Sequence, residues 1–221
     1  MRIGYVGAIY HAVARGNNRQ AVFREPQDYD HFLRLLLSLK ATIPFRLYGY
    51  CLMTNHVHLL LQPDEEASLS ALLQRLLGTY ARHHNQRYGC EGHLWKNRFR
   101  SRVVTNDAYA LRVLAYIDLN PVRAHLCQAA HEYVWSSARA HLLGSADPCL
   151  DLYLPLVVAK KHQTYRELLE CCGGQRLPEL EVYRPRGRPT KKSSDDFSAR
   201  PKESYPQNRQ TIFEGGGGDD G

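Results

Sequence analysis

Residues 45–62 read FRLYGYCLMTNHVHLLLQ. They predict two adjacent strands, 45–53 and 56–62, because both runs are short, apolar and rich in aromatic or aliphatic side chains. Side chains alternate across a strand, so His56 and His58 point to one face and the residue between them to the other. Two neutral imidazoles side by side on a rigid strand suit a divalent metal. Alone, a His-x-His pattern is weak evidence, since chance surface or core histidines produce it too.

A second motif follows about sixty residues later. A helix is predicted over 106–119, where apolar residues recur at helical spacing and the first Asn or the Asp after it is a suitable N-cap. Pro121 should end or kink this helix. Tyr116 and Asn120 are four residues apart and share a helix face. If that face lies against the histidine strand, Asn120 adds a third metal ligand and Tyr116 a nucleophile. Tyr109 lies about 10 Å from Tyr116 along the axis, too far to share a metal with Asn120, and we assign it to packing or substrate contact.

Together these two motifs resemble the REP-associated tyrosine transposases, a branch of the single-tyrosine HUH transposases, which are also called insertion-sequence-200-like. The resemblance covers residues 1–145, because further segments match in the family's order. These segments are Tyr10–Arg19, Tyr48–Met53, Gly92–Ser101 and Trp135–Ser137. One position departs from the family, which usually has proline where this chain has Thr54. The substitution puts the geometry of the loop in doubt more than the chemistry.

The resemblance implies a metal-dependent, sequence-specific endonuclease and strand transferase that acts on single-stranded, hairpin-flanked DNA. His56, His58 and Asn120 would bind Mg²⁺ or Mn²⁺, an assignment that their mixed and incomplete ligand set also favours. Tyr116 would be the nucleophile, leaving a 5′-phosphotyrosine linkage and a free 3′-hydroxyl. The residues alone leave two alternatives open, a binding module that has lost cleavage and a phosphodiesterase that uses water. They also leave open whether the chain acts alone or as a homodimer.

Basic residues support a nucleic-acid partner. The chain carries a net charge of +7, and arginines interleaved with aromatic rings gather over 75–102, where they could contact phosphates and stack on bases. A solvated helix face followed by a strand is the alternative interpretation. We predict that Lys96, Arg98 and Arg100 alternate along a strand and follow a phosphate backbone. Four residues could read an unpaired guide sequence beside the hairpin: Arg15, Asn17, Asn18 and Arg19. The alternative interpretation is a turn capped by the Asn side chains.

The order of predicted elements is β-α-β-β-α-β-α, with further strands over 6–14 and 99–104 and helices over 26–42 and 68–88. This order predicts an α+β, ferredoxin-like split βαβ fold. Its antiparallel sheet should carry helices on one face and leave the other free for substrate.

Three regions are expected along the chain: a transposase domain at 1–145, a helical extension at 146–176 with one helix over 154–171, and a disordered basic tail at 177–221. Within the tail, Arg186 and Arg188 lie in a segment that resembles the core of an AT-hook, which would enter a narrow minor groove. A basic linker is the other interpretation of that segment.

The six cysteines form no Cys-x-x-Cys motif and indicate reduced thiols. The first residues lack a signal-peptide pattern, and no apolar run reaches the roughly 20 residues of a membrane helix. We therefore expect a soluble, cytoplasmic and nucleoid-associated protein.

Overall fold

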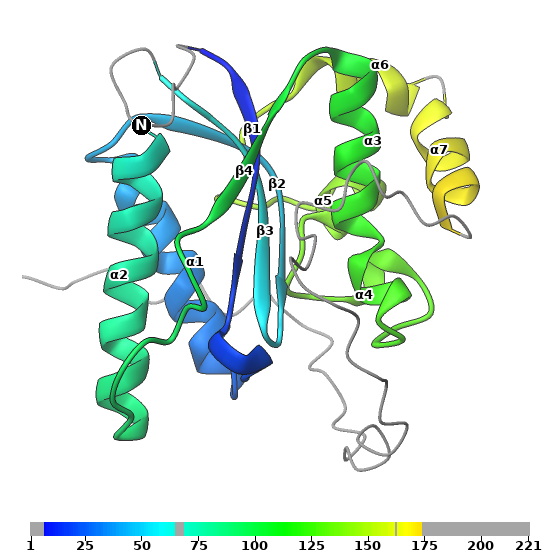
Figure 1. The fold of residues 1–221 in the computed structure, drawn as a ribbon. Coiled ribbons are helices and arrows are strands. Elements are labelled where there is room, and N and C mark those ends of the chain that lie inside the picture. The colour runs from blue at the N-terminus through cyan, green and yellow to red at the C-terminus, as the bar shows by residue number, and fades with distance from the viewer. Residues whose placement is uncertain (1–6, 65–68, 162, 174–221) are drawn as a thin grey trace, which may run out of the picture.

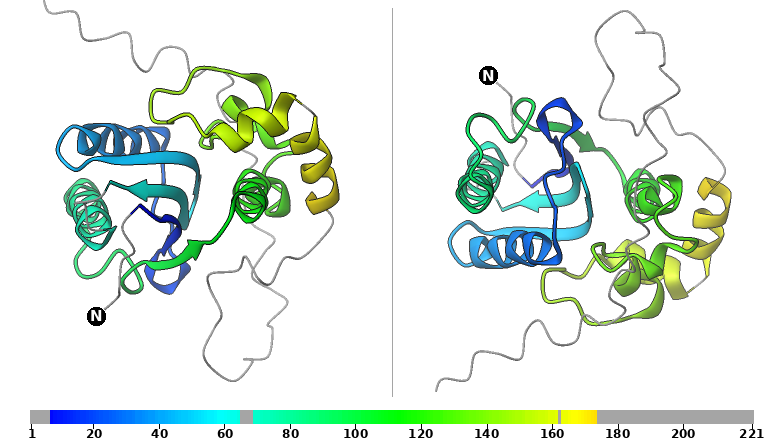
Figure 2. Two further views of the ribbon diagram at one scale, coloured as in Figure 1. Left: turned by 90° about the horizontal axis from the view of Figure 1, so that it is seen from above. Right: turned by 90° about the horizontal axis from the view of Figure 1, so that it is seen from below.

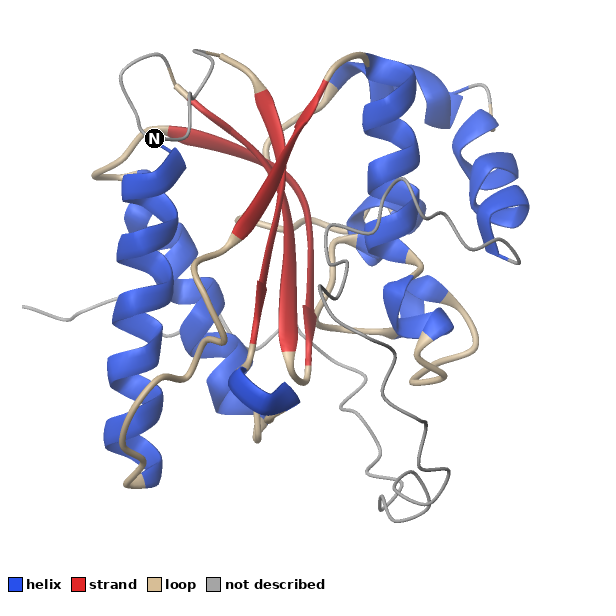
Figure 3. Cartoon of the chain, in the orientation of Figure 1, coloured by secondary structure: helices blue, strands red, loops and turns tan. Residues whose placement is uncertain are grey.

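A computed structural model describes residues 7–64, 69–161 and 163–173 of the chain. Its centre is a four-stranded sheet with strand order β2-β3-β1-β4, in which every neighbouring pair is antiparallel (red in Figure 3). The strands are β1 (Ile9–Arg15), β2 (Phe45–Met53), β3 (His56–Pro63) and β4 (Arg100–Val104). The predicted ferredoxin-like α+β fold is therefore confirmed, and the strand pair read from residues 45–62 is a two-residue hairpin.

The two helices of the split βαβ unit cover one face of the sheet, as predicted (Figure 2). They are α1 (Pro26–Lys40) and α2 (Leu69–Tyr88). Pro26 opens α1 at a position where a missing backbone donor costs nothing. The inner stripes of both helices are fully buried, with Phe32 and Tyr80 in edge-to-face contact. Together with the sheet, this layer contributes to one hydrophobic core that continues on the opposite face.

The opposite face is not left free, which corrects the expectation from sequence. α3 (Asp107–Asp118) packs across it (Figure 2), followed by the short α4 (Asn120–Arg123). Gly49 allows this close approach, because a Cβ atom there would lie 2.5 Å from Leu114 Cδ2. Asn106 is the N-cap of α3, accepting a hydrogen bond from the backbone N–H of the third helical residue. The predicted break before Pro121 is also observed, between α3 and α4.

Further short helices complete the α3 side of the molecule (Figure 1). They are η2 (Ala130–Glu132), α5 (Ala138–Leu143), α6 (Leu154–Lys161) and α7 (Thr164–Gly173), and a 3-10 turn, η1 (Asn17–Arg19), follows β1. The single helix expected over 154–171 is thus two helices. Gln163 has a left-handed φ of 61°, which a continuous right-handed helix cannot contain. The expected tail lies outside the described residues.

All six cysteines are free thiols in the structure. A membrane span would require a longer and more apolar helix than any within residues 7–64, 69–161 and 163–173.

Candidate functional site

Three histidine rings and one tyrosine ring meet on the sheet face that α3 covers. Strand pairing places Val13 opposite His58, and residues two apart on a strand share a face, so His11 faces the same side. The His58 ring centroid lies 5.0 Å from that of His56, 5.3 Å from His11 and 5.7 Å from Tyr116. The structure therefore brings together two of the predicted ligands and the predicted nucleophile, which are far apart in the chain.

The environment keeps both predicted histidine ligands in the neutral, metal-binding form. Burial, followed by the nearby Arg15 charge, lowers the pKa of His56 to about 3. Burial also holds the pKa of His58 well below its usual range, with the neighbouring His56 the next cause. His56 Nδ1 lies 2.6 Å from Asn55 Oδ1. An amide oxygen only accepts, so Nδ1 carries the hydrogen and Nε2 keeps the lone pair that a metal needs.

Asn120 lies one helical turn beyond Tyr116, at the break between α3 and α4. Its Nδ2 atom donates a 2.8 Å hydrogen bond to the Tyr116 carbonyl oxygen. A carbonyl oxygen only accepts, so this bond leaves the Asn120 amide oxygen available as a ligand. Within the described part of the chain, no group of three or more His, Cys, Asp or Glu side chains is arranged to hold a metal ion. The predicted set of His56, His58 and Asn120 is not such a group, because its third ligand is an amide oxygen.

An arginine that was not predicted as a site residue contacts the ring of Tyr116. The Arg123 guanidinium lies 5.0 Å from the centroid of this ring, within the range of a cation–π interaction. Arg123 also donates a 2.8 Å hydrogen bond to the carbonyl oxygen of Cys172 in α7. Its spacing of seven residues from Tyr116, two helical turns, was the available signal. Tyr109 and Tyr116 both pack against the core, but the cation over the Tyr109 ring is Arg112, at 5.9 Å.

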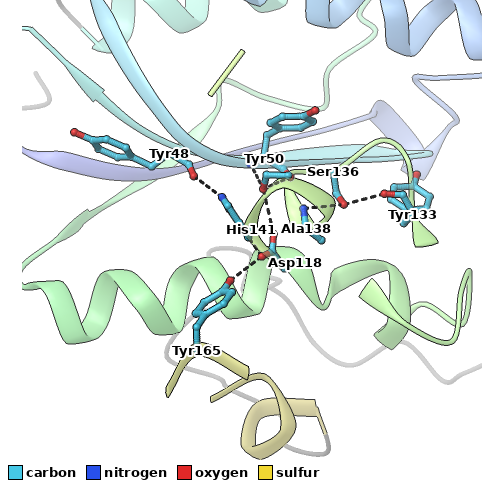
Figure 4. A network of polar contacts seen from close by, with 9 residues as sticks. Tyr48, Tyr50, Asp118, Tyr133, Ser136, Ala138, His141 and Tyr165 are labelled. Carbon is cyan, nitrogen blue, oxygen red and sulfur yellow. Dashed lines mark hydrogen bonds and ion pairs between the residues drawn. The ribbon is translucent and has the colours of Figure 1, made fainter. Parts of the chain in front are cut away.

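Two residues after Tyr116, a buried carboxylate connects α3 by hydrogen bonds to neighbouring elements (Figure 4). Asp118 is fully buried. Its Oδ1 accepts from Ser137 Oγ at 3.1 Å, and its Oδ2 accepts from His141 Nδ1 at 2.8 Å and Tyr165 OH at 2.7 Å. His141 Nε2 in turn donates to the Tyr48 carbonyl oxygen of β2 at 3.0 Å. Burial beside this carboxylate raises the pKa of Tyr165. The network joins α3, α5, α7 and the sheet, and so fixes the helix that carries Tyr116.

The predicted guide-reading residues lie next to the histidine pair. Arg15 pairs with His56 across β1 and β3, and Asn17–Arg19 form the turn that follows. Gly16 N donates to the Asn55 carbonyl oxygen at 2.8 Å, and a Cβ at Gly16 would lie 2.5 Å from the Gln20 carbonyl oxygen. The turn is thus bound tightly to the hairpin that carries His56.

Thr54, the departure from the family pattern, sits in this hairpin. Its carbonyl oxygen accepts hydrogen bonds from Val22 N at 2.8 Å and Phe23 N at 3.1 Å. The neighbouring loop therefore stabilises the two-residue turn from outside, and the turn does not depend on a proline. His56 and His58 remain on one face of β3.

The predicted basic strand is shorter than expected. Lys96 and Arg98 lie in the loop before β4, so their alternation along a strand with Arg100 is wrong. Strand pairing places Arg100 opposite Val13 and Arg102 opposite His11, which puts both arginines on the histidine face. Arg102 was missed as a site residue, although its two-residue spacing from Arg100 was visible.

The other arginines of the basic segment 75–102 that precede Lys96 lie away from the histidine face. Arg75, Arg82 and Arg87 lie on α2, the helix layer on the far side of the sheet (Figure 2). The proposed AT-hook residues, Arg186 and Arg188, lie outside the described part of the chain.

Comparison with known proteins identifies the family. Residues 5–120 match the family described as IS200-like transposases. This match spans more than half of the chain, and the protein therefore belongs to the IS200-like transposase family.

Two solved structures are similar to this chain, to different degrees. A REP-associated tyrosine transposase bound to a REP hairpin is 16% identical, with a TM-score of 0.55, and the match covers 70% of this chain and 92% of that one. A crystal structure described as a transposase from Deinococcus radiodurans R1 is 20% identical, with a TM-score of 0.39 and coverage of 58% and 92%. No curated protein sequence matches the chain.

Proposed function

We propose that this transposase-family protein cuts and rejoins single-stranded DNA beside a hairpin, with Tyr116 as the nucleophile. The observation that carries the proposal is the position of the Tyr116 ring, 5.7 Å from the ring of His58 and 6.0 Å from that of His11. A tyrosine used only for packing would not need three histidines on the facing sheet. The REP hairpin bound to the similar solved structure supports hairpin DNA as the substrate class.

His56, His58 and Asn120 would hold Mg²⁺ or Mn²⁺. Two neutral imidazole nitrogens and one amide oxygen leave further positions for water and a phosphate oxygen, as in working sites for these ions. The bound ion supplies Lewis-acid stabilisation of the charge on the phosphate oxygens.

The phenol of Tyr116 forms a bond to phosphorus while the bond to the 3′-oxygen breaks. One proton leaves the phenol, and one reaches the departing 3′-oxygen. A phenol ionises near a pKa of about 10, so its phosphate ester can be displaced again by a 3′-hydroxyl. The covalent intermediate therefore retains the bond energy, and strands can be rejoined without ATP. Arg123, over the ring, favours the negative charge of the attacking phenolate.

Basic and amide side chains around this site would position the DNA. Arg100 and Arg102 lie on the histidine face, where they can contact phosphates. Arg15 and the turn Asn17–Arg19 lie beside His56, and their side-chain types can read the edges of guanine and adenine.

A gel assay with end-labelled hairpin DNA and Mn²⁺ tests the proposal. We expect a covalent protein–DNA band in the wild type that disappears in Tyr116→Phe and survives in the matched control Tyr109→Phe. His58→Ala should abolish the band as well. A shifted but uncut DNA would indicate a binding module, and cleavage without an adduct would indicate a hydrolase. Either result contradicts the proposal.

A further inference from the structure

His11 is a buried histidine that neither the predicted ligand set nor the nucleophile accounts for. It lies in the middle of β1 and is 2% exposed. Its Nε2 atom is 3.0 Å from His58 Nδ1, and the two rings stack with an interplanar angle of 24°. The same ring meets Tyr116 edge-on at 6.0 Å. His11 therefore touches both a proposed metal ligand and the proposed nucleophile.

The contact between the two imidazoles restricts where their hydrogens can be. Both rings are buried, with His11 2% and His58 4% exposed. A hydrogen bond between His11 Nε2 and His58 Nδ1 needs a hydrogen on one of these atoms and a lone pair on the other. If Nδ1 of His58 donates, its Nε2 keeps a lone pair. In the opposite arrangement, His58 Nε2 carries the hydrogen and cannot bind a metal.

The other proposed histidine ligand, His56, also has a hydrogen-bond partner at its Nδ1 atom. Asn55 Oδ1 accepts from His56 Nδ1, which leaves the Nε2 lone pair of His56 available. His11 and Asn55 thus occupy equivalent positions behind the two histidines. Partners that hold the far nitrogen of a metal-binding histidine orient the ring and select its tautomer.

We propose that His11 is a positioning residue for the metal site, which accepts the hydrogen of His58 Nδ1 and so directs the Nε2 lone pair of His58 to a divalent cation. This inference rests on the proposed function, because it assigns His58 as a ligand. It explains why a polar ring occupies a buried strand position where an aliphatic side chain would be less costly to bury.

Two substitutions of similar length separate hydrogen bonding from packing. In His11→Gln the amide oxygen can take the place of Nε2 as acceptor, whereas His11→Met fills a similar volume without a strong acceptor. Mn²⁺ binding to the full chain without DNA is measured by titration calorimetry. Nitrogen NMR of the imidazoles in the metal-free protein reports the tautomer of His58.

We expect His58 to carry its hydrogen on Nδ1 in the wild type and in His11→Gln. In His11→Met this preference should be lost, and the affinity for Mn²⁺ should fall by about 10- to 100-fold. The Gln variant should bind Mn²⁺ within a few-fold of the wild type. Thermal melting of each variant establishes that it is folded.

Three results would overturn the inference. They are a wild-type His58 with its hydrogen on Nε2, a folded Met variant with wild-type Mn²⁺ affinity, and equal losses in the folded Gln and Met variants. The first result comes from the wild type, so the inference can be tested even if His11→Met does not fold. A wild type that binds no Mn²⁺ would instead remove the proposed metal site, while the NMR measurement still decides whether His11 controls the His58 tautomer.

Discussion

Single residues in this protein act through the sheet face on which they lie. His11, His56 and His58 share a face because two strands pair in one register, and a shift by one residue would turn one strand's histidines to the other side. The same register places Arg100 and Arg102 beside them on β4. Three histidines, two arginines and the ring of Tyr116 are thus brought together on this face, although they come from distant segments of the chain.

Arg102 is expected to contribute a phosphate contact that Arg75 does not. Arg102 lies on the histidine face, opposite His11, whereas Arg75 is exposed on α2 in the layer behind the sheet. We predict that Arg102→Gln weakens hairpin binding for all sequences and lowers the slope of log K against log salt by about 1. Arg75→Gln is the matched control and should leave the slope unchanged. Fluorescence anisotropy over a salt series measures both, and equal effects of the two variants would contradict the assignment.

At the scale of elements, α3 is the part whose position matters most, because it carries Tyr116. Gly49 lets it approach β2, and Asp118 connects it to α5, α7 and the sheet. Hydrogen bonds to a buried carboxylate are strong, and losing one partner leaves the others poorly compensated. We therefore interpret the Asp118 network as the support of the candidate active site.

Two substitutions test this support at different strengths. Asp118→Asn breaks the buried pair with His141 and should lower the free energy of unfolding by about 3–5 kcal/mol. Tyr165→Phe removes one hydrogen bond to a charged group and should cost about 1.5–3 kcal/mol. Glu167→Gln, on the exposed side of α7, is the control and should change little. Urea unfolding followed by circular dichroism measures all three, and a Tyr165→Phe variant as stable as the control would show that α7 is not anchored through Asp118.

On the scale of the whole molecule, the segment after residue 145 packs on the transposase fold. Asp151 Oδ2 accepts from Lys40 Nζ at 2.5 Å and from Leu47 N at 2.7 Å. Tyr153 OH donates to Asp107 Oδ1 at 2.9 Å. The extension thus contacts α1, β2 and the first turn of α3. We propose domain boundaries at residues 145 and 176, as expected from the sequence. In this proposal the helical extension, residues 146–176, supports α3.

Truncation distinguishes the roles of these regions. A chain that stops after residue 176 should cleave hairpin DNA at the wild-type rate and bind duplex DNA more weakly, because it lacks Arg186 and Arg188. A chain that stops after residue 145 should be markedly destabilised, since Tyr165 no longer reaches Asp118. Cleavage assays, duplex titration and thermal melting provide the readouts. Loss of cleavage at 176, or an unchanged melting temperature at 145, would contradict these roles.

Much of this arrangement could be predicted from local patterns. The order of strands and helices follows from hydrophobic periodicity and capping residues, and it identified the ferredoxin-like fold. The spacing of His56 from His58, and of Tyr116 from Asn120, placed each pair on one face of its own element. These relations span a few residues, so chain geometry alone determines them.

Contacts between segments that are distant in the sequence could be identified only from the tertiary structure. His11 meets His58, Arg102 joins the histidine face, and Asp118 gathers partners from α5 and α7 because of strand register and helix packing. The second sheet face is covered because α3 has an apolar side to bury there. No local periodicity encodes such contacts, since each depends on how whole elements pack against one another.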